Sequence, residues 1–488
     1  MPPTINPMNV SFLQELMTTV AEQGRALLPK GLLWGETAED IETLAKALVS
    51  SRGEASGVAI ARQILDFYGR LDDEAKRAFF TFLGERMQPD ATAVAAAAGA
   101  YLKTTDAMAL ARLQKAVESP RQEFFRRLNL APGATGGIVA MRRDLLRLGR
   151  DDPLLRLVDD DLKHLLYSWF NRGFLVLRRI DWQTPAAILE KIIQYEAVHQ
   201  IEGWDDLRRR LDPKDRRCFA FFHPALIDEP LIFVEVALTH EMSDAIAPLL
   251  SEPPKNLPIE TPTVAVFYSI SNCQEGLKGI TFGNFLIKQV VEDLVRELPS
   301  LKTFVTLSPV PGFTRWLDSP AGQSATAILL TDEENAALSL LRRQRWHARA
   351  RASAAVEAPL LALAAQYFLI AKSADGKPVD PVARFHLGNG ALLERINYLG
   401  DVSSKGLQQA HGLMVNYRYN LKEIEKNHEA FANQGSVPAS RQVRALLRTR
   451  EKSVAGKEPE RLPLLALATD KARGSSPPSS GSGGTKSS

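Results

Sequence analysis

The sequence predicts an α+β protein in which an all-α region precedes a region of mixed strands and helices. The length of 488 residues exceeds one ordinary hydrophobic core and favours two domains. Near residue 170 the apolar residues change from helical spacing to short continuous runs. We therefore predict an N-terminal α-helical domain over residues 1–170, an α/β domain over 171–460, and a Gly/Ser/Pro-rich tail over 461–488. The tail is expected to be disordered, because its composition offers little apolar surface to bury.

The first region has a helical pattern throughout. The segments IETLAKALVSSRGEASGVAIARQILDFYGRL and DEAKRAFFTFLGERM place apolar side chains on one helix face, with charged side chains between them. Asp72 and Asp73 are a start signal for one helix, and Pro89-Asp90 interrupts the chain before the next. The glycine-rich LAPGATGG (130–137) follows a helical stretch and not a strand, so we interpret it as a helix–helix connection.

The second region mixes strand-like runs with helical segments. Sequence patterns typical of strands are CFAFFH, PLIFVEVALT, TVAVFYSIS, LKTFVTLS and ATAILL. They predict a sheet formed mainly between about residues 217 and 330. Helices are predicted at PAAILEKIIQYEAV, at FLIKQVVEDLVREL and along the Arg/Ala-rich LLRRQRWHARARASAAVEAPLLALAAQYFLI.

Charge and cysteine content exclude several classes of protein. Lys+Arg 60 against Asp+Glu 57 gives a net charge of +3, which does not indicate a nucleic-acid or anionic-membrane partner. Cys218 and Cys273 are too few and too far apart for a disulfide framework or a zinc site. The 8 histidines form no H-x-x-x-H pair, so no metal site is expected.

Targeting signals are also not apparent in the sequence. The N-terminus has neither the pattern of a secretory signal nor the arginine content of a mitochondrial presequence. We read no apolar run as long enough to span a membrane. The expected location is therefore the cytoplasm.

A glycine-spaced turn is the first candidate for chemistry. NCQEGLKGITFGN follows the strand-like TVAVFYSIS and precedes the helical FLIKQVVEDLVREL, and it contains Gly276, Gly279 and Gly283. Strand, glycine turn and helix together aim backbone amides at a phosphate group. The same glycines are also explained by a helix entry that requires positive φ angles. The spacing matches neither the P-loop nor the G-x-G-x-x-G fingerprint, so both interpretations stay open.

Ser308 and His386 are two further candidates. Ser308 ends a strand-like run, and Pro309 and Pro311 make the following turn rigid, so its hydroxyl is either a substrate contact or a turn residue. His386 lies in ARFHLGNGALLERINYLGDVS, just ahead of a helical stretch expected to begin near Ala391. A histidine in such a glycine-rich bend suits general acid–base catalysis, although from the residues alone a purely structural histidine is the better explanation. The arginine cluster 342–351 reads as a solvated helix face that could also neutralise phosphates.

Several long segments together resemble the malonyl-CoA decarboxylase family. They run in order over roughly residues 120–420: FFRRLNLAPGATGGIVAMRRDLL, EPLIFVEVALT, VFYSISNCQEGLKGITFGNFLIKQVV, LSPVPGFTRWL, PVARFHLGNGALLERINYLGDVS and GLMVNYRYNL. The resemblance implies an N-terminal helical domain followed by a catalytic domain similar to the GNAT acetyltransferase fold. It also implies conversion of malonyl-CoA to acetyl-CoA and CO2 in fatty acid metabolism, without a metal or organic cofactor, by a homo-oligomer, commonly a tetramer.

The resemblance also assigns the site. The family's catalytic serine falls on Ser308 and its histidine on His386, the serine cast as proton acceptor and the histidine as proton donor. The malonyl-CoA-binding loop falls on Lys278, Gly279, Ile280, Thr281, Phe282, Gly283 and Asn284. The glycine spacing of this loop departs from the usual acetyltransferase signature, so the amides that reach the pyrophosphate are not assigned.

Two other functions fit the same sequence features. One is a CoA-dependent acyltransferase on the GNAT fold, which would transfer an acyl group to an amine and release free CoA thiol. The other is an acyl-CoA sensor or helical interaction protein, which would bind CoA esters without releasing CO2. A carboxylate such as Glu394 or Asp401 near His386 would favour an imidazolium, whereas a helix N-terminus would disfavour it.

Overall fold

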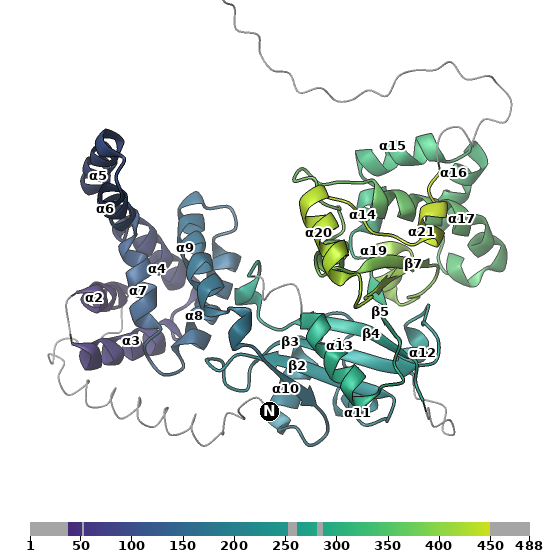
Figure 1. Cartoon of the computed structure of the whole chain (residues 1–488), viewed down its shortest axis with the longest axis horizontal. Helices are drawn as coiled ribbons and strands as arrows, with labels where there is room; N and C mark the ends of the chain where they lie inside the picture. Colours follow the sequence, from purple (N-terminus) through teal and green to yellow (C-terminus); the bar gives the residue numbers. More distant parts are fainter. Residues whose placement is uncertain (1–37, 51–52, 252–260, 281–285, 449–488) are drawn as a thin grey trace, which may run out of the picture. The chain divides into compact units, whose positions relative to one another are not determined.

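The computed structural model describes residues 38–50, 53–251, 261–280 and 286–448 (Figure 1). All of them belong to one compact unit, Met1–Arg448. The predicted tail over 461–488 and the loop residues Thr281, Phe282, Gly283 and Asn284 lie outside the described residues.

The N-terminal part of the described chain is all helical, as predicted. Its helices are α2 (Ala38–Val49), α3 (Glu54–Tyr68), α4 (Asp73–Arg86), α5 (Ala91–Thr104), α6 (Ala107–Val117), α7 (Pro120–Leu128), α8 (Ala134–Leu148) and α9 (Pro153–Trp169). Asp72 caps α4 by accepting from the Ala75 amide, and Asp90 caps α5, so both helix starts predicted from the sequence are confirmed. LAPGATGG lies between α7 and α8 and runs into the start of α8, as expected of a helix–helix connection.

The rest of the described chain builds one mixed sheet. Its strands are β1 (Val176–Ile180), β2 (Arg216–Phe222), β3 (Pro230–Thr239), β4 (Val264–Asn272), β5 (Thr303–Thr306), β6 (Ser308–Pro309), β7 (Leu392–Asn397) and β8 (Met414–Arg418). The strand order is β1-β2-β3-β4-β5-β8-β6, with β7 paired to β8. Only β4 and β5 run parallel among these pairs. The α+β class predicted from the sequence is confirmed.

Helices cover both faces of this sheet. The helical segments of this part are η2 (Arg172–Phe174), α10 (Ala186–Tyr195), α11 (Trp204–Leu211), α12 (Ala247–Leu250), η3 (Glu275–Leu277), α13 (Leu286–Glu297), α14 (Phe313–Leu317), α15 (Pro320–Leu329), α16 (Asp332–Leu338), η4 (Ser339–Arg342), η5 (Trp346–Ala348), α17 (Ala350–Leu369), α18 (Pro381–Gly388), α19 (Ser404–Ala410), α20 (Ile424–Gln434) and α21 (Arg441–Ala445). Helix α13 packs Leu286, Ile287 and Val290 against the sheet, and Figure 1 shows it lying across the central strands. Helices α10 and α11 bury Ile188 and Leu207 in a separate apolar cluster with Phe233 of β3.

Three secondary-structure predictions are wrong. The Arg/Ala-rich LLRRQRWHARARASAAVEAPLLALAAQYFLI is α-helical only from Ala350 onward, so most of the arginine cluster 342–351 lies in the short segments η4 and η5 and in the turns around them and not on a helix face. Arg345 has φ +53°, which no α-helix continues through.

ATAILL belongs to helix α15, where Ser319 accepts from the Gly322 amide and Pro320 occupies the first turn. Short apolar runs cannot be told from helix segments by periodicity alone, and here the N-terminal cap decides the outcome. The stretch after Ala391 is strand β7 and not a helix, and with β1 and β8 it extends the sheet beyond the predicted residues 217–330.

We predicted that no apolar run is long enough to span a membrane, and helix α17 contradicts this prediction. By length and composition alone, Ala350–Leu369 qualifies as a candidate span among the described residues. Half of its apolar window is buried inside the protein, and Leu360, Leu363 and Tyr367 belong to the main hydrophobic core. The core helix of a protein can pass the same test as a membrane span, and because these three side chains lie in the main core, α17 is a core helix.

Candidate active site

Ser308 lies where the chain leaves its pairing with β4 and begins to pair with β8. Strand β5 ends at Thr306, and the two-residue strand β6 then pairs Ser308 with Val415 and Pro309 with Met414 of β8. Side chains alternate along such a segment, so Thr306 and Ser308 face the same side while Leu307 is buried on the other. The Ser308 hydroxyl donates to Thr306 Oγ1 over 2.8 Å. Pro309 and the turn that follows hold this hydroxyl at a fixed place.

The sequence suggested that His386 lies in a glycine-rich bend ahead of a helix. In the structure it lies in the last turn of helix α18. Asp380 caps this helix by accepting from the Ala383 amide, and Pro381 occupies the first turn. Asp380 is itself buried and accepts a second bond from the Tyr367 hydroxyl, at 3.1 Å. The cap therefore fixes the start of the helix that carries the imidazole.

The structure brings Ser308 and His386 together although 78 residues separate them. Ser308 Oγ lies 3.1 Å from His386 Nε2, and the Tyr419 hydroxyl lies 2.8 Å from Nδ1. Because the Ser308 proton is directed to Thr306, its oxygen accepts from the ring, which places the imidazole proton on Nε2. Nδ1 then accepts from Tyr419, and every polar atom of this group has a partner.

Burial decides the charge of His386. The side chain is 3% exposed, and burial lowers the pKa of the imidazole to about 3. Ser308 is 5% exposed. Burial is the cause of this shift, and neither Glu394 nor Asp401, the carboxylates considered from the sequence, contributes to it. The ring is neutral at neutral pH.

This neutral histidine makes the fold sensitive to acid. In the unfolded chain the imidazole titrates near its usual pKa of 6.5, whereas in the fold it titrates near 3, so the unfolded state binds the proton more readily. Stability is complete above about pH 6.5 and falls as the pH drops toward 3. At about pH 4.5 the expected loss is about 2–3 kcal/mol. The free energy of unfolding is measured with urea at neutral pH and at about pH 4.5, for the parent and for His386→Asn. The parent should lose about 2–3 kcal/mol more than the variant on acidification. Equal losses would contradict a neutral buried ring.

Tyr417 and Tyr419 belong to the site but were not singled out from the sequence. The Tyr417 ring stacks on the imidazole, with centroids 4.5 Å apart, and its backbone N–H donates to Thr306 Oγ1. Tyr419 follows β8 and donates to Nδ1. The segment GLMVNYRYNL contains both, and their spacing of two residues is the one available signal, because it places both side chains on one face of an extended segment.

Removing the Tyr419 hydroxyl tests its positioning role. Tyr419→Phe leaves the ring in place but deprives Nδ1 of its partner, so the tautomer with the proton on Nε2 is no longer enforced. We expect kcat to fall about 10-fold with little change in KM, in line with one lost hydrogen bond. Tyr398→Phe is the matched control, since that hydroxyl bonds only to Ser353 among the described residues, away from the imidazole. Equal effects of the two variants would contradict a role in catalysis.

The glycine turn is held against the helical region. Arg142 of α8 is buried, pairs with Asp159 of α9, and donates to the carbonyl oxygens of Gly276 and Lys278 at 2.8 and 3.0 Å. A β-carbon at Gly276 would lie 1.9 Å from the Val139 carbonyl oxygen, so only glycine permits this approach. Gly279 has φ +78°, which also favours glycine. The local backbone geometry therefore explains why both positions are glycine.

The sheet splits beside this turn. Strand β4 pairs with β5 only from Val264 to Phe267, and the Leu307 amide donates to the Phe267 carbonyl just beyond. Beyond Phe267, β4 pairs only with β3. The segment that follows β5 pairs with β8 instead. Lys278, Gly279 and Ile280 follow the far end of β4, and Ser308 lies where the strands part.

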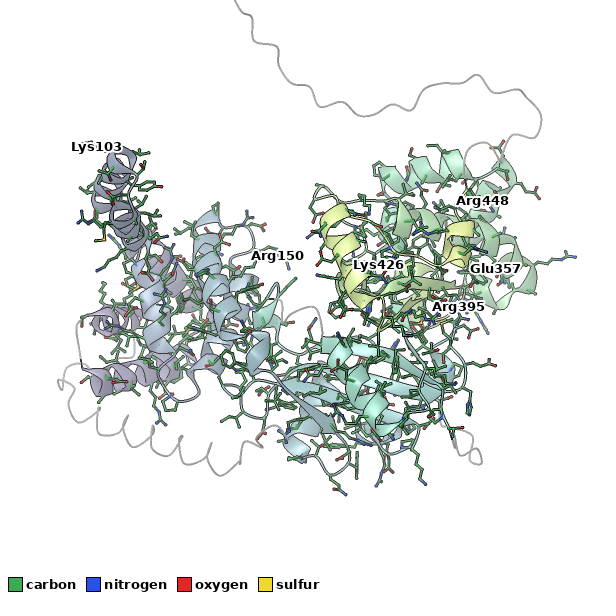
Figure 2. All side chains as sticks on the ribbon, viewed as in Figure 1. Lys103, Arg150, Glu357, Arg395, Lys426 and Arg448 are labelled. Carbon is green, nitrogen blue, oxygen red and sulfur yellow. The ribbon has the colours of Figure 1, made fainter. Side chains whose placement is uncertain are left out.

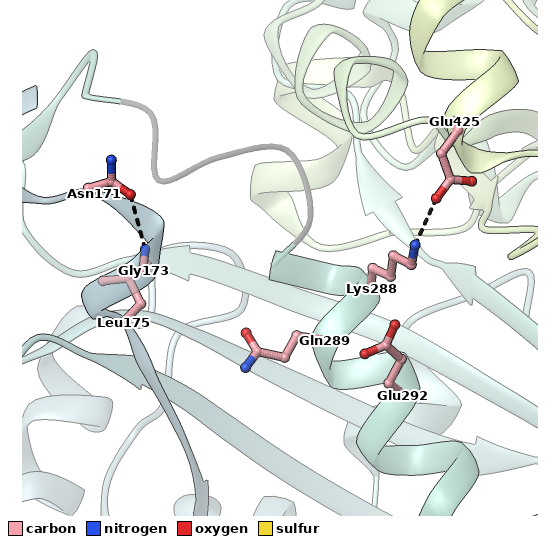
Figure 3. Close-up of a pocket in the computed structure, with 7 residues that line it drawn as sticks. All are labelled: Asn171, Gly173, Leu175, Lys288, Gln289, Glu292 and Glu425. Carbon is pink, nitrogen blue, oxygen red and sulfur yellow. Dashed lines mark hydrogen bonds and ion pairs between the residues drawn. The ribbon is translucent and has the colours of Figure 1, made fainter. Parts of the chain in front are cut away.

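Among the cavities near this part of the fold, two differ clearly in charge. The one in Figure 3, of about 720 Å³, lies beside the start of α13, and Lys288 is its single cation against Glu292 and Glu425. Lys288 pairs with Glu425 at 2.7 Å. A second cavity, of about 580 Å³, is lined by Lys278 and Gly279 of the turn and by arginines that follow Arg142. In the described part of the chain no group of three or more His, Cys, Asp and Glu side chains is placed to hold a metal ion.

Comparison with known proteins gives consistent matches over most of the chain. A family model described as malonyl-CoA decarboxylase C-terminal domain matches residues 173–457, and one described as the N-terminal domain matches 87–170. Among curated proteins, the chain is similar to the mitochondrial malonyl-CoA decarboxylase of Anser anser anser, 38% identical over 67% of this chain and 69% of that protein. The Mus musculus protein of the same name is 37% identical over 69% of this chain and 73% of its own length.

Solved structures are similar as well. Malonyl-CoA decarboxylase from Rhodopseudomonas palustris is 52% identical and superposes with a TM-score of 0.80, covering 84% of this chain and 100% of that chain. The Agrobacterium vitis structure is 55% identical with a TM-score of 0.79 and the same coverage. The structure from Cupriavidus metallidurans is 36% identical with a TM-score of 0.65, covering 84% of this chain and 99% of that one.

Proposed function

The chain belongs to the malonyl-CoA decarboxylase family, a family of carboxy-lyases, and on that premise we propose that Ser308 and His386 carry out its reaction. The reaction converts malonyl-CoA into acetyl-CoA and CO2. The observation that supports these two residues most is the contact of 3.1 Å between Ser308 Oγ and His386 Nε2.

The chemistry requires three things of a protein. The bond from C2 to the carboxylate must stand perpendicular to the thioester carbonyl plane, so that its electron pair passes into the carbonyl as CO2 leaves. The enolate oxygen needs hydrogen-bond donors, and C2 then needs a proton. The thioester is its own electron sink, so we propose that the reaction proceeds without a metal or organic cofactor.

Ser308 is proposed to hold the malonyl group in the reactive rotamer. Its hydroxyl donates to Thr306 in the ligand-free fold, and rotation about the Cβ–Oγ bond would redirect this proton to the malonyl carboxylate or carbonyl. The bonded neighbours keep the oxygen in place, so little freedom is lost when substrate binds. We propose that the linear arm of the substrate lies along the edge where β4 and β5 part, between the glycine turn and this hydroxyl.

His386 is proposed to deliver the proton to C2 from Nε2. A neutral imidazole is a weak acid, but a thioester enolate is a much stronger base, so the transfer is downhill. The Tyr419 hydroxyl, which donates to Nδ1, stabilises the negative charge that develops on the ring. The balance is one C–C bond broken, one C–H bond formed, and one proton returned to the ring from water.

The proposed function is tested by incubating purified protein with malonyl-CoA. CO2 and acetyl-CoA should appear in equal amounts, with no free thiol. Free CoA thiol in the presence of an amine acceptor would support the acyltransferase instead, and tight binding without CO2 would support an acyl-CoA sensor. The rate with methylmalonyl-CoA in a parallel assay shows whether the site has space for a methyl group on C2.

Setting and assembly are further parts of this proposal. We place the protein in the cytoplasm and, by family resemblance, in fatty acid metabolism. The two free, buried cysteines Cys218 and Cys273 fit a reducing compartment. The curated relatives are named mitochondrial, so fractionation of cells that make the protein is the direct test. A homo-oligomer, a tetramer by family resemblance, and no nucleic-acid or membrane partner are the remaining expectations; light scattering measures the mass.

A further inference from the structure

We propose that the helical region supplies a subsite for the 3′-phosphate of the CoA thioester, in the basic cavity between α8 and the glycine turn. The cavity, of about 580 Å³, is lined by Arg143, Arg147 and Arg150 from the helical region and by Lys278 from the turn. Glu275 is the one carboxylate among the residues that line it. The inference rests on the proposed function only in taking a CoA ester as the ligand.

The arginines lie on one side of a rigid element. Arg143 and Arg147 are one turn apart on α8. Arg150, labelled in Figure 2, follows the end of that helix. All three are exposed. The planar guanidinium fork matches a phosphomonoester, which accepts two parallel hydrogen bonds, and such groups bind phosphate better than isolated amines do.

Their charges are only partly neutralised within the protein. Arg147 forms a two-bond pair with Asp73 at 2.6 Å. Arg143 approaches Asp144 at 3.4 Å, but that carboxylate already pairs with Lys76 at 2.9 Å. Among the described residues, no carboxylate pairs with the Arg150 guanidinium. A surplus of positive charge therefore faces the cavity.

The cavity adjoins the turn that is expected to hold the pyrophosphate. Arg142 of α8 donates to the Gly276 and Lys278 carbonyl oxygens, so α8 and the glycine turn are held together. Lys163 of α9 does not line the cavity but lies beside the turn, because a β-carbon at Gly279 would lie 3.9 Å from its Nζ. The acidic cavity of Figure 3, by contrast, offers one lysine already paired with Glu425. Of these two cavities, only the basic one suits a dianionic phosphate.

The experiment compares the binding of CoA and dephospho-CoA by calorimetry, without turnover. The parent protein should prefer CoA, and Arg143→Gln/Arg150→Gln should bind CoA about 10–100-fold more weakly while dephospho-CoA changes less than about 2-fold. Turnover should show the same pattern: KM for malonyl-CoA rises, kcat stays, and KM for malonyl-dephospho-CoA is unaffected. Arg112→Gln on α6 is the matched control and should change none of these.

Several outcomes would overturn the subsite. They are no preference for CoA in the parent, an equal loss for both ligands, or an unchanged affinity accompanied by a lower melting temperature, which would assign the arginines to the C-terminus of α8. Arg150→Gln alone keeps the test valid if the double variant folds poorly. If CoA binding behaves as expected but malonyl-CoA is not decarboxylated, the proposed function fails and the subsite stands.

Discussion

Replacing His386 by asparagine is expected to lower kcat about 10²–10⁴-fold while the fold and the affinity for CoA are retained. Asparagine cannot supply an acidic ring N–H at the position of Nε2, so the enolate must wait for a proton from water. The substitution also removes the group bonded by Ser308 and Tyr419. Steady-state kinetics with malonyl-CoA and calorimetry with CoA measure the two quantities.

His411→Asn is the matched control for this result. His411 has φ +50°, a conformation that asparagine adopts readily, so the same exchange is tolerated at that position. We expect its kcat to stay within a few-fold of the parent value. An unchanged kcat in His386→Asn would remove this imidazole from the mechanism.

Replacing Ser308 by alanine is expected to lower kcat about 10–10³-fold, since the malonyl group loses the donor that fixes its rotamer. Two hydrogen bonds end on this hydroxyl, one to Thr306 and one to His386. Their loss should cost no more than about 1–3 kcal/mol of stability. Turnover and thermal unfolding are measured on the same preparation.

Ser353→Ala provides the comparison for the serine. Ser353 also bonds to a tyrosine hydroxyl, but on α17. We expect this variant to keep full turnover. A Ser308→Ala protein that unfolds far more easily, yet turns over normally while folded, would identify Ser308 as a turn residue.

The architecture was largely predictable because its strongest signals are local. Helical spacing and caps such as Asp72 and Asp90 identified the N-terminal helices, and continuous apolar runs identified β2 to β5. The errors fell where tertiary context decides. The apolar run of α15 reads equally well as a strand, and β7 contains Glu394 and Arg395, whose charges interrupt a strand pattern.

The site was less predictable from residue patterns. Neither Ser308 nor His386 has a distinctive local signature, and the family resemblance alone paired them across the chain. The roles of Tyr419 and Thr306 could not be predicted, because only the pairing around β8 brings them close to Ser308 and the imidazole. Arg142 gave no signal at all, since a buried arginine in a helix reads as a surface charge until its partners Asp159 and Gly276 are known.

The measurement that tests the central claim most directly is the turnover of the Ser308→Ala/His386→Asn double variant beside the two single variants. If the hydroxyl and the imidazole act as one unit on the malonyl group, the double variant should have a kcat within about 3-fold of the slower single variant. A kcat reduced by the full product of the two separate losses would show that the residues act independently, and would contradict the account.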